Sequence, residues 1–182
     1  MDTKPITILT LSGDRESGKD TIADLLVDNW GFKKLELAGL AKEIVCRKLG
    51  LKIEQLKDRK TKELYRPEII AVAEKLKELD LLFHCHTVTS EMWELRELGF
   101  TRFVVADARF PYEALYFRGL CKNFKSLYIQ SDLGKPHPEV YVESYIHSYF
   151  EKKNGGVIIN NRKERYDRNN QDLINQLVKF VN

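Results

Sequence analysis

The sequence lacks the features that mark several large classes of protein. It has 3 cysteines among 182 residues, far apart at positions 46, 85 and 121, and no C-x-x-C pair. An odd number of separated cysteines argues against a disulfide framework and against a structural zinc site, and a reducing cytosol is consistent with it. No apolar run approaches the length of a membrane span, and the chain enters a strand-like run directly, without a signal-peptide pattern. We therefore expect a soluble, cytoplasmic protein without a membrane partner.

The chain also lacks a large excess of charge of either sign. Its net charge is +3, from 30 basic and 27 acidic side chains, which is far from the dense cationic surface of a dedicated nucleic-acid binder. We expect a small-molecule substrate and no nucleic-acid partner. Internal repeats and low-complexity linkers are missing too, so 182 residues with 43% hydrophobic content suit a single α/β domain spanning 1–182.

What the sequence does contain is an alternation of strand-like and helical segments, which is typical of a parallel sheet. Strand-like runs lie at 5–11, 32–38, 100–107, 124–130 and 157–160. Helical patterns lie at 21–27, 40–49 and 167–181, and helix formers dominate 53–98, with Pro67 near the start of one helix. We therefore predict an α/β protein with a parallel sheet of about five strands.

The segment between the first strand and the first helix carries the strongest chemical signal. Gly13 and Gly18 frame it, and Lys19 follows with the G-x-x-x-x-G-K spacing of a phosphate-binding loop. Glycines allow a tight turn whose N–H groups and following helix N-terminus point at an anion, and the lysine adds a mobile charge. Asp20 stands where the usual pattern has serine or threonine, and a hydroxyl arrives at Thr21. The alternative is a glycine turn that merely joins a strand to a helix.

A second signal is Asp107, which ends an apolar strand-like run and is followed by Ala108-Arg109-Phe110-Pro111. A carboxylate at this edge of an open α/β sheet is placed to hold magnesium or its waters. The planar fork of Arg109 is suited to a phosphate. The alternative is that Asp107 only caps the helix beginning at Pro111.

Other conspicuous residues receive a structural interpretation. His84-Cys85-His86 has metal-ligand types, but i, i+2 positions on a helix face apart, and no further ligands complete a zinc site. Trp93, Leu95 and Leu98, with Phe100, are expected to pack in the core. The charged run at 162–168 is expected to be a solvated loop, although its place after the last strand leaves adenine contact open.

The two motifs together resemble the deoxynucleoside monophosphate kinases of bacteriophages and bacteria. The resemblance rests on the loop with Ala23-Asp24, on 107–114, on 31–32 and 40–43, and on 157–161, and it is weak in the middle of the chain and around 131–154. The related animal-type phosphomevalonate kinases share the Ser-Gly-Lys-Asp loop and resemble Lys62-Glu63-Leu64-Tyr65-Arg66. That family tends to carry a second basic residue after the arginine of the later motif, where this chain has Phe110-Pro111, so we favour the nucleotide kinase.

The resemblance implies a three-layer α/β/α P-loop NTPase fold of the nucleoside monophosphate kinase type and transfer of the ATP γ-phosphate with Mg²⁺. It implies that ATP phosphates are bound by Gly13, Asp14, Arg15, Glu16, Ser17, Gly18, Lys19, Asp20 and Thr21. Acceptor phosphate contacts would come from Lys42, Arg66, Arg109 and Arg15, with Arg15 and Lys19 also at the reaction centre. Metal ligands would come from Asp20, Thr21 and Asp107. An acceptor-binding helical region would cover about 40–98 and a lid about 131–154.

Several alternatives stay open at this level. Relatives often have a base at Glu16, and the lid segment has few cations, namely Lys135, Lys152 and Lys153. His137, Glu143 and Ser144 only loosely match a cluster in the relatives. The acceptor base, a homodimer as against a monomer, and host cytoplasm for a viral source are not decided by the sequence. Phosphomevalonate kinase and a nucleotide-binding switch without phosphoryl transfer remain alternatives.

Overall fold

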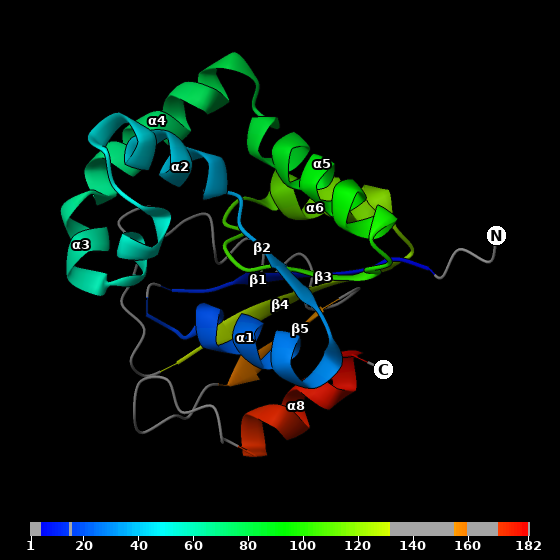
Figure 1. Cartoon of the computed structure of the whole chain (residues 1–182). Coiled ribbons are helices and arrows are strands. Elements are labelled where there is room, and N and C mark those ends of the chain that lie inside the picture. The colour runs from blue at the N-terminus through cyan, green and yellow to red at the C-terminus, as the bar shows by residue number, and fades with distance from the viewer. Residues whose placement is uncertain (1–4, 15, 132–154, 160–170, 182) are drawn as a thin grey trace. The chain divides into compact units, whose positions relative to one another are not determined.

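The computed structural model describes residues 5–14, 16–131, 155–159 and 171–181. The chain divides into two compact units, one formed by 1–35 with 94–182 and the other by 36–93. The first unit contains the sheet (Figure 1), and the second is made of helices.

The first unit confirms the predicted parallel sheet. Its five strands run in the order β2-β3-β1-β4-β5, and every neighbouring pair is parallel. Their bounds are β1 Thr7–Ser12, β2 Lys33–Leu35, β3 Arg102–Val105, β4 Asn123–Gln130 and β5 Gly155–Ile159. Because all strands point the same way, their carboxyl ends lie at one edge of the sheet, where α/β proteins place their ligands.

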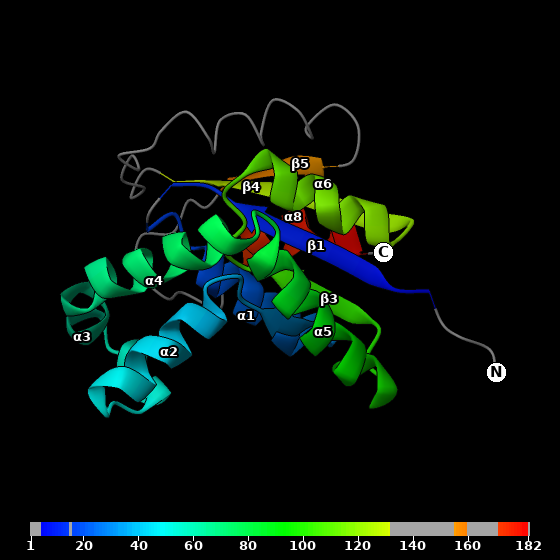
Figure 2. The same cartoon turned by 90° about the horizontal axis from the view of Figure 1, so that it is seen from above.

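Helices cover both faces of this sheet. Figure 1 shows α1 (Lys19–Trp30) and α8 (Gln171–Val181) on one side and α6 (Pro111–Leu120) on the other. In Figure 2, seen from above, α6 lies in front of the strands and α8 is partly hidden behind them. Leu9 and Leu11 of β1, which alternate with Thr10 along the strand, pack with Leu26 and Leu177 in one buried cluster. Burying one such leucine contributes roughly 2 kcal/mol, so the α1 and α8 face anchors the sheet.

Two predicted strands are shorter in the structure than the apolar runs suggested. The run at 32–38 forms a strand only over Lys33–Leu35, and the run at 100–107 forms one over Arg102–Val105. Ala106 still donates its N–H to the Leu35 carbonyl at 3.1 Å. Asp107 therefore lies in the turn after β3, not in the strand itself.

The second unit is helical, as the composition of 53–98 predicted. It contains α2 (Gly39–Leu49), a 3₁₀ turn at Ile53–Lys57, α3 (Arg59–Leu64), α4 (Arg66–Leu79) and most of α5 (Phe83–Glu97). Its own core is small and consists of Ala41, Val45, Cys46, Leu56 and Ile69. Within the described residues, no helix is long and apolar enough to cross a membrane.

The predicted burial is wrong for Trp93 and Leu98, whereas Leu95 and Phe100 are half-buried. Trp93 is 42% exposed and Leu98 is 74% exposed. The buried residues of α5 are instead His84, Cys85, Val88 and Met92. Positions 85, 88 and 92 follow helical spacing along one face, so the helix buries its smaller side chains and leaves the tryptophan on the surface.

Candidate functional site

The loop between β1 and α1 has the backbone of a tight anion cradle. Gly13 has φ +135° and Gly18 has φ +96°. Glu16, at φ +65°, is the one residue other than glycine with positive φ among the described residues, a conformation that costs energy and occurs preferentially at functional turns. Ser17 N–H donates to the Asp14 carbonyl at 3.2 Å, which closes the turn before the helix. The sequence-predicted loop thus has the conformation that its glycines allow.

Gly13 is required by close packing as well as by its φ. A Cβ at this position would lie 2.3 Å from the Ile129 carbonyl oxygen, which belongs to the backbone of β4. No rotation of a side chain relieves such a contact. The loop therefore approaches β4 directly, and glycine is the residue that permits it.

Lys19, the first residue of α1, folds back over this loop. Its ammonium group donates to the Gly13 carbonyl and to the Asp14 carbonyl, the latter at 2.7 Å. Gly18 is the N-cap of the helix and supplies no side-chain cap. The positive end of α1 and the lysine therefore converge on the same short segment, an arrangement suited to a polyphosphate.

Asp20 and Thr21, the two predicted metal ligands in the loop, differ in accessibility. The Asp20 side chain is 60% exposed and accepts from the Lys34 ammonium at 2.8 Å. Lys34, on β2, also lies 3.4 Å from Asp24 one turn further along α1. Thr21 is 2% exposed. The carboxylate therefore faces water while the threonine side chain packs inside.

Asp107 and Arg109 follow the carboxyl end of β3, and the phosphate loop follows the carboxyl end of β1. These two strands are paired, with Thr10 of β1 opposite Val105, the last residue of β3. Ala108 is buried, whereas Asp107 and Arg109 are half-buried. The structure thus brings these residues and the loop to one edge of the sheet.

The alternative role of Asp107 as a helix cap is not what the structure shows. α6 begins at Pro111 as predicted, but its N-cap is Phe110. The capping carboxylate is that of Glu113, which accepts from the N–H of Phe110 at 2.9 Å. Sequence reasoning missed Glu113, although an acid three residues after an N-cap is a recognisable capping signal.

Lys42 and Arg66, the predicted acceptor-phosphate contacts, belong to the second unit. Lys42 on α2 forms an ion pair with Glu36. Arg66, the first residue of α4, binds both carboxylate oxygens of Glu63, at 2.9 Å from Nε and 2.6 Å from Nη2. Both cations are therefore held by a carboxylate within their own unit.

The remaining predicted residues lie outside the described part of the chain. These are Arg15, the lid candidate beyond Ser131, including Lys135, His137, Glu143, Ser144, Lys152 and Lys153, and the charged run at 162–168. Their roles stay predictions. Among the described residues, no group of three or more His, Cys, Asp and Glu side chains could hold a metal ion by itself.

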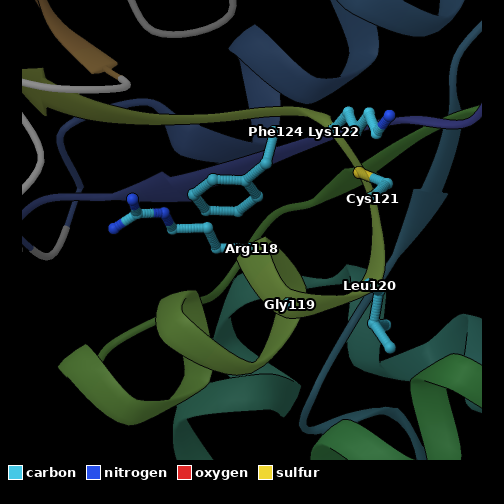
Figure 3. Close-up of a pocket in the computed structure, with 6 residues that line it drawn as sticks. All are labelled: Arg118, Gly119, Leu120, Cys121, Lys122 and Phe124. Atoms are coloured by element: carbon cyan, nitrogen blue, oxygen red, sulfur yellow. The ribbon is translucent and has the colours of Figure 1, made fainter.

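A cavity of about 460 Å³ lies away from this site (Figure 3). It is lined by Arg118, Gly119, Leu120, Cys121, Lys122 and Phe124. These residues join the end of α6 to the start of β4, so the cavity is at the amino edge of the sheet, opposite the phosphate loop. Burial raises the pKa of the Cys121 thiol, which makes it a poor nucleophile at neutral pH.

The chain is similar to one protein family and to several solved structures. A family model for phosphomevalonate kinase matches residues 11–123, more than half of the 182 residues. Among solved structures, a dephospho-CoA kinase from Campylobacter jejuni is 13% identical with a TM-score of 0.49, over 96% of both chains. TT1252 from Thermus thermophilus is 22% identical with a TM-score of 0.46, over 96% of this chain and 99% of that one. A shikimate kinase from Aquifex aeolicus is 16% identical with a TM-score of 0.41, over 95% of both. The family match spans the phosphate loop and both Asp107 and Arg109.

Proposed function

This chain belongs to the phosphomevalonate kinase family, and we propose that it transfers the γ-phosphate of ATP to the phosphate group of a small acceptor. The acceptor that we favour is a deoxynucleoside monophosphate. The observation that supports the proposal is the parallel pairing of β1 with β3, because the Lys19 loop and the segment with Asp107 and Arg109 follow the carboxyl ends of these two strands. Phosphoryl transfer needs positioning and charge stabilisation more than covalent chemistry. A lysine, an arginine and a carboxylate at one sheet edge supply both.

In this mechanism Lys19 exchanges its bonds to the Gly13 and Asp14 carbonyls for bonds to phosphate oxygens. The N–H groups of the loop and the start of α1 bind the same polyphosphate. Arg109 holds the acceptor phosphate and offsets repulsion between the two anions. No general base is required, because the attacking oxygen already belongs to a phosphate anion near neutral pH.

Magnesium suits the carboxylates of this edge. Mg²⁺ is commonly held by one or two carboxylates together with substrate phosphates, and Asp20 and Asp107 offer such oxygens. The exposure of Asp20, against 2% for Thr21, supports Asp20 as the direct ligand in the loop. The ion would neutralise charge on the phosphates during transfer. Lys34 would then release the Asp20 carboxylate.

The residues after Arg109 support a nucleotide acceptor. The rings of Phe110 and Tyr112 stack with centroids 5.2 Å apart and an angle of 11° between their planes. A flat aromatic surface next to a phosphate-binding arginine suits a base. Phosphomevalonate has no ring. Phosphomevalonate kinases also tend to carry a second basic residue after the arginine of this motif, whereas this chain has Phe110-Pro111 there.

Phosphomevalonate is the second candidate acceptor, and the family match is the observation that favours it. The Lys62-Glu63-Leu64-Tyr65-Arg66 segment of the second unit agrees with that family as well. Both candidates present a phosphate monoester to the same cations. They differ in what the protein must recognise beyond the phosphate.

ATP consumption by the purified protein with Mg²⁺ tests the proposal. The acceptor panel contains the deoxynucleoside and ribonucleoside monophosphates and phosphomevalonate. Stimulation by one or more deoxynucleotides supports the proposal, and stimulation by phosphomevalonate alone transfers the chain to the second candidate. ATP binding without stimulation by any acceptor contradicts both and favours a nucleotide-binding switch.

Variants identify the groups responsible. Lys19→Ala should abolish turnover, whereas Lys122→Ala, an exposed lysine at the opposite sheet edge, should leave it unchanged. Arg109→Ala should lower kcat/KM at least about a thousandfold, or about 4 kcal/mol, because it touches the transferring or accepting phosphate. Asp20→Asn should raise the Mg²⁺ concentration needed for half-maximal activity more than Thr21→Val does.

A further inference from the structure

Glu113 is a buried carboxylate without a role in the proposed phosphate and metal contacts. It is 5% exposed, on the first turn of α6. Its Oε2 atom accepts from two consecutive backbone N–H groups, that of Arg109 at 2.7 Å and that of Phe110 at 2.9 Å. A polar group buried to this extent persists only when hydrogen bonds replace its water.

Helix capping accounts for one of these two bonds. Phe110 is the N-cap of α6, and a glutamate three residues later normally bonds to the N-cap N–H. The return bond, from Glu113 N–H to the Phe110 carbonyl at 3.0 Å, fixes the same turn. The bond to Arg109 lies one residue earlier, outside the helix and on the segment that leaves β3. Capping does not require it.

The extra bond fixes the backbone that carries Arg109. Ala108, the residue before it, is 1% exposed and therefore held by packing. Arg109 N–H on one side and Phe110 N–H on the other are held by a single oxygen. The backbone at Arg109 is therefore held in place, and the half-buried side chain extends from a fixed Cα.

We propose that Glu113 is a positioning residue that sets Arg109 for the acceptor phosphate. This inference rests on the proposed function, since it assigns Arg109 to the phosphorylated acceptor. Preorganisation of a cation matters in phosphoryl transfer because a displacement of about 1 Å can cost on the order of a hundredfold in rate. Because Arg109 is assigned to the acceptor phosphate, loss of Glu113 should raise the KM for the acceptor more than the KM for ATP.

Three variants test this role. Glu113→Ala removes the acceptor of both bonds and should raise the KM for the acceptor at least tenfold while the KM for ATP changes less than twofold. Glu113→Gln keeps a carbonyl oxygen at the same reach and should stay within threefold of the wild type. Asp172→Ala removes an exposed acid from the first turn of α8 and serves as the matched control, with both KM values unchanged. Equal changes in the two KM values for Glu113→Ala, or no change in either, would overturn the proposal.

A measurement independent of turnover separates this inference from the proposed function. Amide hydrogen exchange in the protein without substrates should show protection of the Arg109 and Phe110 N–H groups that is lost in Glu113→Ala and kept in Glu113→Gln. Protection that survives in Glu113→Ala would refute the positioning role even if the chain is a kinase. If no acceptor stimulates the wild type, the proposed function fails, and the exchange pattern still decides whether Glu113 anchors this segment. Should Glu113→Ala not fold, Glu113→Asp, whose shorter side chain cannot reach both N–H groups, replaces it in both measurements.

Discussion

Replacing Gly13 by alanine should destabilise the protein far more than the same change at Gly31. Both glycines have positive φ, +135° and +67°, so both substitutions strain the backbone. At Gly31 nothing lies within 4 Å of the new Cβ, and the cost is about 1 kcal/mol. At Gly13 the Cβ meets the Ile129 carbonyl oxygen at 2.3 Å. Separating β1 from β4 to relieve that contact should bring the total to about 3–5 kcal/mol.

Urea denaturation and thermal unfolding of the two variants measure this difference. For a chain of this size each kcal/mol lowers Tm by roughly 2–4 °C, so Gly13→Ala should lower it by at least about 6 °C and Gly31→Ala by about 2–4 °C. Gly13→Ala should also weaken ATP binding, because the loop must move to accommodate the methyl group. Equal losses of stability in the two variants would show that backbone conformation alone, and not the approach to β4, requires glycine at position 13.

Three further predictions concern structural contacts. Arg102 donates to the Trp30 carbonyl at 3.1 Å and to the Val181 carbonyl, at the ends of α1 and α8. Arg102→Met should therefore lower the free energy of unfolding, measured in urea, by about 2 kcal/mol. A decrease of less than about 0.5 kcal/mol would contradict this bridging role. The pKa of Asp58 is lowered, chiefly by the hydrogen bond that its carboxylate accepts from the Thr61 backbone N–H, so the stabilisation from this charge is complete above about pH 4 and is lost as pH falls through the lowered folded-state pKa. The free energy of unfolding of the wild type should therefore exceed that of Asp58→Asn by less in acid than at neutral pH. A difference between the two proteins that does not change with pH would refute this. Burial raises the pKa of Cys121, so its alkylation, followed by mass spectrometry, should be slower at pH 8 than that of free cysteine and should accelerate above pH 9.

The local parts of the site were predictable from the sequence. Glycine spacing, a preceding apolar strand and a following amphipathic helix determine the phosphate loop over about 20 consecutive residues. The position of Asp107 after an apolar run placed it at the carboxyl edge without knowledge of the strand order. The positions of these residues at the ends of strands were predictable because each depends on neighbours in the chain, where backbone conformation and side-chain periodicity are encoded directly.

The parts that depend on distant contacts were not predictable. The ion pair of Asp20 with Lys34 joins residues whose strands and helices meet only after folding. On α5, hydrophobicity favoured Trp93 for the core, but the face that is covered carries Cys85, Val88 and Met92. A helix pattern indicates that one face is buried and cannot identify which neighbouring element covers it. Glu113 is an intermediate case, because its capping role was available from the sequence and its second bond was not.

The point at which the second unit joins the sheet has a consequence for how such a protein can change. Residues 36–93 leave the first unit directly after β2 and return to it before β3, and these two strands are paired through Leu35 and Val105. Because β2 and β3 are parallel, the chain that leaves the carboxyl end of β2 must return to the amino end of β3, and the helical unit lies within this crossover. The lengths of such connections can change without a change in strand pairing. We therefore expect this crossover to tolerate insertions and deletions while β1 and β3, which lead into the loop and into Asp107, keep their register.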